Sequence, residues 1–105
     1  MVKGTTPTYI LTLPKDIDLS DATNVYVTFK DIKNNLIMHK TGNDLEIDKN
    51  VINVFLTQSE TLAFPEGHAY LQVNWTYETG GVPKRAATKE KVIEIYRNLY
   101  NEVIE

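Results

Sequence analysis

The chain has 105 residues, the usual length of one domain, and 42% of them are hydrophobic while 24% are charged. This composition predicts a folded globular chain rather than a disordered one. A net charge of −3 argues against nucleic acid as a partner, because phosphate binding needs clustered basic side chains. The absence of cysteine excludes disulfides, zinc–thiolate sites and thiol nucleophiles.

The N-terminal residues give no targeting signal. They are polar and carry Lys3 where a secretory signal would need an apolar run, so we expect no signal peptide and synthesis in the cytoplasm. No apolar run approaches the roughly 20 residues that span a bilayer, so we expect no membrane partner.

Strand patterns fill the first half of the chain. The clearest alternation places Val25, Val27 and Phe29 on one face, which is typical of a half-buried strand. Turn-forming residues at 31–35, 41–44 and 48–50 separate the next apolar runs, and a capping-rich loop precedes the second strand. We expect strands over residues 9–13, 24–30, 36–40, 45–47 and 51–56, and a connecting loop over 16–23 with Ile17 and Leu19 turned inward.

A short helical turn is predicted over residues 57–64, because Thr57 and Glu60 have the spacing of a capping box. The longest alternation in the chain follows over residues 68–78 and predicts a central strand. Its inward residues are expected to be Ala69, Leu71, Val73, Trp75 and Tyr77, and residues 79–83 to form a loop.

The segment from Arg85 onward has two interpretations. Val92, Ile95, Tyr96 and Leu99 fit a helical stripe, and no Gly or Pro follows Pro83. The β-branched residues after Lys91, and the need of the long strand for a partner after a Gly-Gly turn, favour a strand. We expect a strand over residues 87–96 and a short turn or helix over 98–104.

About seven short strands, separated by turns, predict an all-β fold: an immunoglobulin-like antiparallel β-sandwich, which a short turn or helix follows at the C-terminus. No repeat or linker divides the chain, so residues 1–105 are expected to form a single domain.

Catalytic and metal-binding patterns are weak. His39 and His68 are far from other ligands in sequence, and Ser20 and Ser59 lie in capping contexts without a nucleophile elbow. The acidic run from Asp16 to Asp21 resembles part of a calcium loop, but it has Asp where an EF-hand needs Gly and Val27 where it needs Glu. We expect no enzyme activity, no cofactor and no metal.

Aromatic side chains on outward faces offer a contact surface. The alternation places Tyr26, Phe55, Tyr70 and Tyr96 on solvent-facing sides of their strands, where they could contact a protein or a glycan. The alternative is that Tyr is simply common on solvated sheet faces.

Several segments resemble a known family. The start Gly4-Thr5-Thr6-Pro7-Thr8-Tyr9-Ile10-Leu11-Thr12-Leu13-Pro14, the step Leu19-Ser20-Asp21-Ala22, the stretch Leu56-Thr57-Gln58-Ser59-Glu60-Thr61-Leu62-Ala63-Phe64 and the end Asn101-Glu102-Val103-Ile104-Glu105 are similar to short tail-module structural proteins of phages and prophages of Gram-positive gut bacteria. The chain also resembles the N-terminal sandwich domain of phage upper baseplate proteins.

The resemblance implies a role in the virion and carries no catalytic residues. It implies a non-enzymatic structural or assembly protein of the tail or baseplate, with phage structural proteins or a second copy as partners. Edge strands are the expected contact, since an exposed edge can pair with a strand of a partner. The alternative is a carbohydrate-binding module that recognises host surface glycans through exposed Tyr residues.

Overall fold

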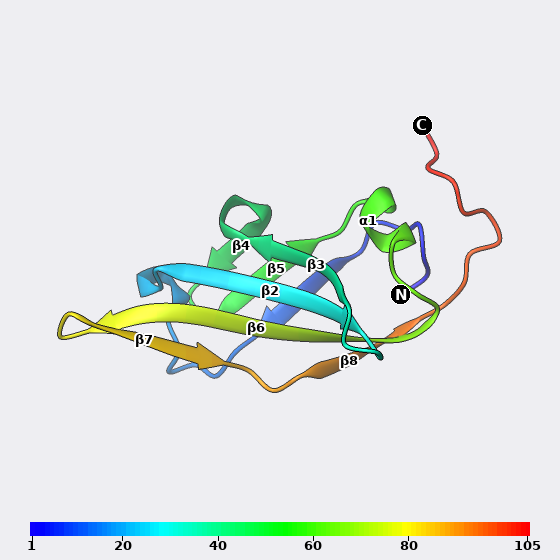
Figure 1. The fold of residues 1–105 in the computed structure, drawn as a ribbon. Helices are drawn as coiled ribbons and strands as arrows, with labels where there is room; N and C mark the ends of the chain where they lie inside the picture. Colours follow the sequence, from blue (N-terminus) through cyan, green and yellow to red (C-terminus); the bar gives the residue numbers. More distant parts are fainter.

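The computed structural model describes residues 1–105 as two packed antiparallel sheets (Figure 1). The smaller sheet has the order β1-β5-β4, and the larger has the order β3-β2-β6-β7, with β8 also paired to β6. The strands are β1 (Thr8–Thr12), β2 (Asn24–Asp31), β3 (Leu36–Thr41), β4 (Leu45–Asp48), β5 (Val51–Phe55), β6 (Gly67–Thr79), β7 (Val82–Ala87) and β8 (Lys91–Ile95).

The predicted all-β sandwich is confirmed, with eight strands in place of about seven. The strand order differs from that of antibody constant domains, where the first and second strands belong to the same sheet. Here β2 lies in the other sheet, between β3 and β6. The sandwich architecture is therefore shared while the order of strands is this chain's own.

The core forms where the predicted inward faces of the two sheets meet. Val27 and Phe29 of β2 and Ile52 and Val54 of β5 are completely buried. The alternation predicted for β6 is confirmed as well, since Ala69, Leu71, Val73 and Trp75 are buried. Strands with period-two patterns thus placed their apolar side chains inward, as the pleat requires.

The helical turn after β5 also follows the prediction. Helix α1 (Gln58–Leu62) begins at a capping box, in which the Thr57 hydroxyl accepts from the Glu60 amide and the Glu60 carboxylate accepts from the Thr57 amide. Behind it, the Phe64 ring packs edge-on against Phe29 with centroids 5.4 Å apart. Two single turns of 3-10 helix, η1 (Leu19–Asp21) and η2 (Gly42–Asp44), complete the loops. No helix is long and apolar enough to cross a membrane.

The return from β6 differs from the single strand expected over residues 87–96. Gly80 and Gly81, both with positive φ, form a two-residue hairpin turn, so Val82 and Pro83 belong to β7 and not to a loop. Both β7 and β8 pair with β6, and residues 88–90 interrupt the ladder between them.

Thr88 explains the interruption. Its hydroxyl accepts a hydrogen bond from the Val73 amide at 3.1 Å, and its own amide donates to the Val73 carbonyl at 2.9 Å. Between the pairs Asn74–Ala87 and Leu71–Lys91, the returning chain carries one residue more than β6 does. An extra residue reverses which side chains face inward, and Ile93 and Ile95 are buried as a result.

The short turn or helix expected over residues 98–104 is not formed. No helix or strand is present after Ile95, and the segment runs along the surface toward α1 (Figure 1). The Gln58 side chain bonds both the amide and the carbonyl of Ile104. An isolated helix of seven residues is unstable without a face to pack on, and Leu99 is 88% exposed here.

Candidate binding surfaces

The four aromatic residues expected to form one contact surface lie on two opposite faces. Tyr26 and Tyr70 project from the outer face of the larger sheet, at pairing positions four residues apart along β2, or roughly 13 Å. Tyr96 lies just beyond β8 on the same face, and its hydroxyl donates to the Glu94 carboxylate. Phe55 projects from the outer face of the smaller sheet, half exposed. No single partner surface of small size can contact all four.

A polar groove of about 290 Å³ lies on the outer face of the larger sheet. We define it by its principal lining residues, which come from four strands and lie on the face that carries Tyr26 and Tyr70: Thr28, Lys30, His39, Tyr70, Gln72, Asn74 and Arg85. Only one of its lining side chains is hydrophobic. The rim of the groove near β7 carries a positive and a negative side chain, because Glu90 lines it together with Arg85.

Hydrogen bonds across the strands hold these side chains in place. The Thr28 hydroxyl lies 3.0 Å from Nδ1 of His39, which ties β2 to β3. Both Nε and Nη2 of Arg85 donate to the Asn74 Oδ1, at 3.3 and 3.0 Å, which ties β7 to β6. The groove is therefore a preformed array of donors and acceptors rather than a set of free side chains.

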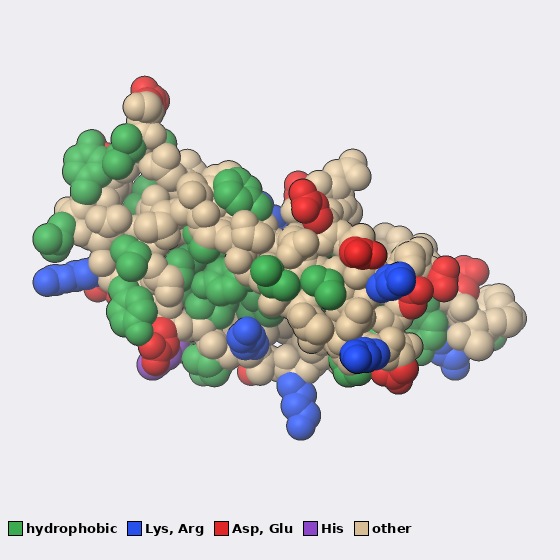
Figure 2. Space-filling view, turned by 180° about the vertical axis from the view of Figure 1, so that it is seen from behind, with side chains coloured by type: hydrophobic (Ala, Val, Ile, Leu, Met, Phe, Trp, Pro, Cys, Tyr) green, Lys and Arg blue, Asp and Glu red, His purple; other side chains and the backbone are tan.

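The segment Leu99 to Ile104 is the second surface. Its four apolar side chains, Leu99, Tyr100, Val103 and Ile104, are between 44% and 88% exposed. Figure 2 shows hydrophobic side chains gathered toward the end of the molecule that carries this segment. Apolar groups so exposed and close together are typical of a surface that a partner covers.

Strand edges form the third surface. The strands β3 and β7 are the two edges of the larger sheet, and β1 and β4 are those of the smaller. The outer edge of β8 is covered, because the Tyr96 amide donates to the Met1 carbonyl at 2.7 Å and the Lys3 amide donates to the Tyr96 carbonyl at 3.0 Å. The edge of β7 has no such cover and remains open to strand addition.

The titratable groups with shifted pKa values lie mainly in turns and caps. Hydrogen bonds from the Ser20 hydroxyl and amide lower the pKa of Asp18, and a hydrogen bond from the Asn35 amide lowers that of Asp31. The hydrogen bond to Glu94 raises the pKa of the Tyr96 hydroxyl. The two carboxylates thus stabilise the loops before and after β2.

The weaker sequence candidates are scattered. Ser20 hydrogen-bonds Asp18 in the η1 turn, and Ser59 lies in the first turn of α1. His39 lies in the groove, whereas His68 lies at the far end of β6 opposite Glu94. No three His, Asp or Glu side chains come together in a way that could hold a metal ion.

The sequence pattern indicated only part of these surfaces. The outward positions of Gln72 and Asn74 follow from the alternation of β6, but Arg85 joins them only because β7 pairs with β6. The exposed segment after Tyr96 gave a misleading signal, since its apolar spacing also suits a helix. No protein-family model matches the chain, and no curated protein matches it significantly in sequence.

Proposed function

We propose that this chain is a non-enzymatic structural or assembly module of a phage tail or baseplate that works through protein–protein contacts. The observation that carries the proposal is the exposed apolar segment from Leu99 to Ile104. Its backbone has no regular structure, and side-chain hydrogen bonds from Gln58 and Asn98 hold it on the surface. Such a segment gains little by packing on its own domain and much by packing on a neighbour.

The partner we infer is another structural protein of the same virion. The uncovered edge of β7 supports this inference, because it offers backbone donors and acceptors to an added strand. The resemblance to tail-module proteins supports a location in the virion. The segment from Leu99 to Ile104 and the edge of β7 are the surfaces that would contact the partner.

Purified virions test the proposal directly. We expect an antibody to the chain to detect it in virions from a host that produces the phage, and the double variant Leu99→Ser/Ile104→Ser to be incorporated at least about 10-fold less, the loss expected from about 1.4 kcal/mol of contact energy. The control is Ile32→Ser, which alters a side chain that is 65% exposed in the turn after β2, away from the segment and from the β7 edge. Detection of the wild-type chain only as a free monomer outside virions would contradict the proposal.

The polar groove favours a second candidate function, binding of a host surface glycan. Fixed polar side chains flanked by Tyr26 and Tyr70 offer hydrogen bonds to sugar hydroxyls and ring faces for stacking. A glycan array without hits, together with unchanged adsorption after Tyr26→Ala and Tyr70→Ala, would remove this candidate. Phe55→Ala is the matched control, because it removes an exposed aromatic ring from the opposite face.

A further inference from the structure

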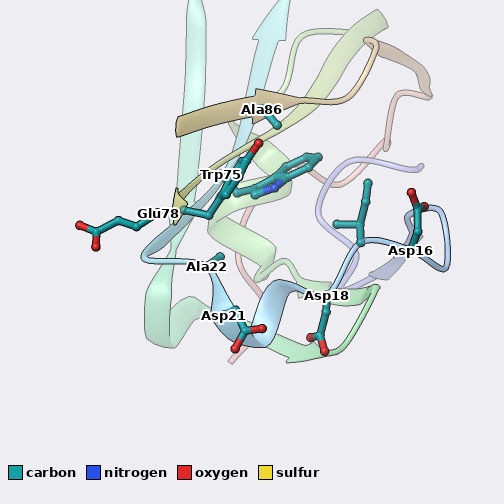
Figure 3. A pocket seen from close by; sticks show the side chains of 9 residues that line it. Asp16, Asp18, Asp21, Ala22, Trp75, Glu78 and Ala86 are labelled. Atoms are coloured by element: carbon teal, nitrogen blue, oxygen red, sulfur yellow. The ribbon is translucent and has the colours of Figure 1, made fainter. Parts of the chain in front are cut away.

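A separate pocket lies at the end of the sandwich that carries η1 and the β6–β7 hairpin (Figure 3). Its volume, about 520 Å³, falls in the range of about 300–1,000 Å³ found for small-ligand sites. Apolar side chains line its floor: Ile17, Ala22, Trp75, Tyr77 and Ala86. The pocket shares no lining residue with the segment from Leu99 to Ile104, so it is independent of the contact proposed above.

Trp75 is the feature that points to a ligand. Its side chain is only 7% exposed, and its indole N–H makes no hydrogen bond within the protein. No polar side-chain atom is both fully buried and without a partner, so this N–H keeps some exposure to solvent. The Trp75 side chain lines the pocket at the η1 end. Figure 3 shows the indole lying across the pocket, with its nitrogen edge toward the η1 loop. This donor has no acceptor within the protein, so an acceptor that enters the pocket can bond to it in place of solvent.

Four carboxylates surround the same opening: Asp16, Asp18, Asp21 and Glu78. Figure 3 shows those of Asp18, Asp21 and Glu78 directed outward from the indole, so they form a charged rim and not a chelating cage. Two cations lie near this rim: Lys49 interacts electrostatically with Asp18, and Lys84 lies opposite Tyr77 in the β6–β7 pairing. Their two positive charges do not balance the four carboxylates. The rim therefore attracts a cation, while the floor accepts apolar surface.

We propose that this pocket binds an arginine side chain presented on a peptide segment of a partner protein. The guanidinium group is planar, stacks on aromatic rings and pairs with carboxylates, and its aliphatic stem suits the apolar floor. The peptide carbonyl supplies the acceptor that the indole N–H lacks. A sugar offers acceptors without a cation, and a polyamine offers a cation without an acceptor. The inference rests on the proposed function only in taking the peptide from another structural protein.

The single tryptophan of the chain gives a direct readout. The indole N–H contributes one cross-peak to a ¹H–¹⁵N NMR spectrum, and that peak belongs to Trp75. We expect the acetylated, amidated tripeptide Gly-Arg-Gly to shift it saturably, with a dissociation constant on the order of 1 mM. The isosteric tripeptide with citrulline in place of arginine is expected to bind at least about 5-fold more weakly, because it lacks the charge.

Two triple variants, each removing three negative charges, test the rim. In Asp16→Asn/Asp21→Asn/Glu78→Gln, binding of the arginine tripeptide is expected to weaken at least about 5-fold. In Glu66→Gln/Glu102→Gln/Glu105→Gln, whose exposed acids lie at or after the α1 end, binding is expected to remain. Thermal unfolding monitored by circular dichroism checks that both fold, and Glu78→Gln alone replaces the first triple if it does not.

Three results would overturn the assignment: no shift of the indole peak at tens of millimolar tripeptide, equal binding of the citrulline tripeptide, or equal losses in the two triple variants. Virion incorporation is measured separately. A chain that enters virions but shows any of these results loses the arginine pocket and keeps the proposed function. A chain that binds the arginine tripeptide but is absent from virions keeps the pocket and loses the proposed function.

Discussion

The two ends of β6 are built differently although the same edge is paired at both. At the α1 end, β8 buries Ile93 and Ile95, and residues Met1 to Lys3 cover its outer edge. At the η1 end, β7 contributes only the half-buried Ala86 to the core, and its outer edge is uncovered. Similar backbone pairing along β6, six residue pairs with β7 and five with β8, therefore coexists with very unequal side-chain burial.

The unequal burial at the two ends of β6 indicates which end contributes more to stability and which end is available for binding. Burial of apolar side chains is the main favourable term in folding, so on this edge of β6 the strand β8 contributes more to stability than β7 does. The η1 end keeps an open edge and a pocket in which the indole N–H has no acceptor within the protein, features that remain available to a partner. Four changes can break or sharpen this contrast.

The largest expected effect is at the α1 end. Phe64 is 1% exposed and packs on Phe29, so Phe64→Ala is expected to lower the free energy of unfolding by about 3–5 kcal/mol. Urea unfolding followed by circular dichroism measures the loss. Val82→Ala on β7 is the comparison and should stay within about 0.5 kcal/mol of the parent. Similar losses for both variants would show that the two ends contribute equally.

The ion pair between Lys40 and Glu60 ties β3 to α1, with Nζ 2.6 Å from Oε2. Lys40→Met leaves the partly buried Glu60 carboxylate without its cation, and we expect the free energy of unfolding to fall by about 2 kcal/mol. The double variant Lys40→Met/Glu60→Gln should recover part of that loss, because no charge then stays unpaired. Full stability in the single variant would contradict this role.

The same pair predicts how stability depends on pH. Burial raises the pKa of Glu60, but hydrogen bonds from Lys40 and Thr57 outweigh burial and leave the pKa below its ordinary range. The ionised carboxylate therefore stabilises the fold above the ordinary pKa of about 4.3, and this stabilisation is lost as the pH falls through the lower folded pKa. Unfolding between pH 7 and pH 3 should be less pH-dependent in Glu60→Gln than in the parent.

The smallest expected effect is at the hairpin. Gly81 has a φ of +78°, and a Cβ at this position would meet no atom within 4 Å, so Gly81→Ala costs only backbone strain, about 1 kcal/mol. Amide hydrogen exchange should accelerate in β7 and stay unchanged in β8, since Thr88 separates them. Faster exchange in both strands would show that they open as one unit.

The sequence predicts well the elements whose information is local. The alternation of β2 and β6 and the capping box at Thr57 specify faces and a helix start within a few residues. The sequence does not predict that the inward-pointing positions change at Thr88. That change depends on which residue of β6 lies opposite each residue of the returning chain. The sequence does not predict the pocket around Trp75 for the same reason. The alternation assigns Trp75 to the core, and only the positions of residues distant in sequence leave a pocket beside its ring.

The hydrogen bonds of Thr88 to Val73 also fix the register at one point of the β6–β7 ribbon. Beyond that point the ribbon ends in a two-glycine turn, where a Cβ added to either glycine would meet no atom within 4 Å. Adding two residues to each strand next to the turn would lengthen the ribbon by roughly 7 Å and leave the β8 pairing in place. The β6–β7 hairpin can thus be lengthened or shortened without changes to the core residues.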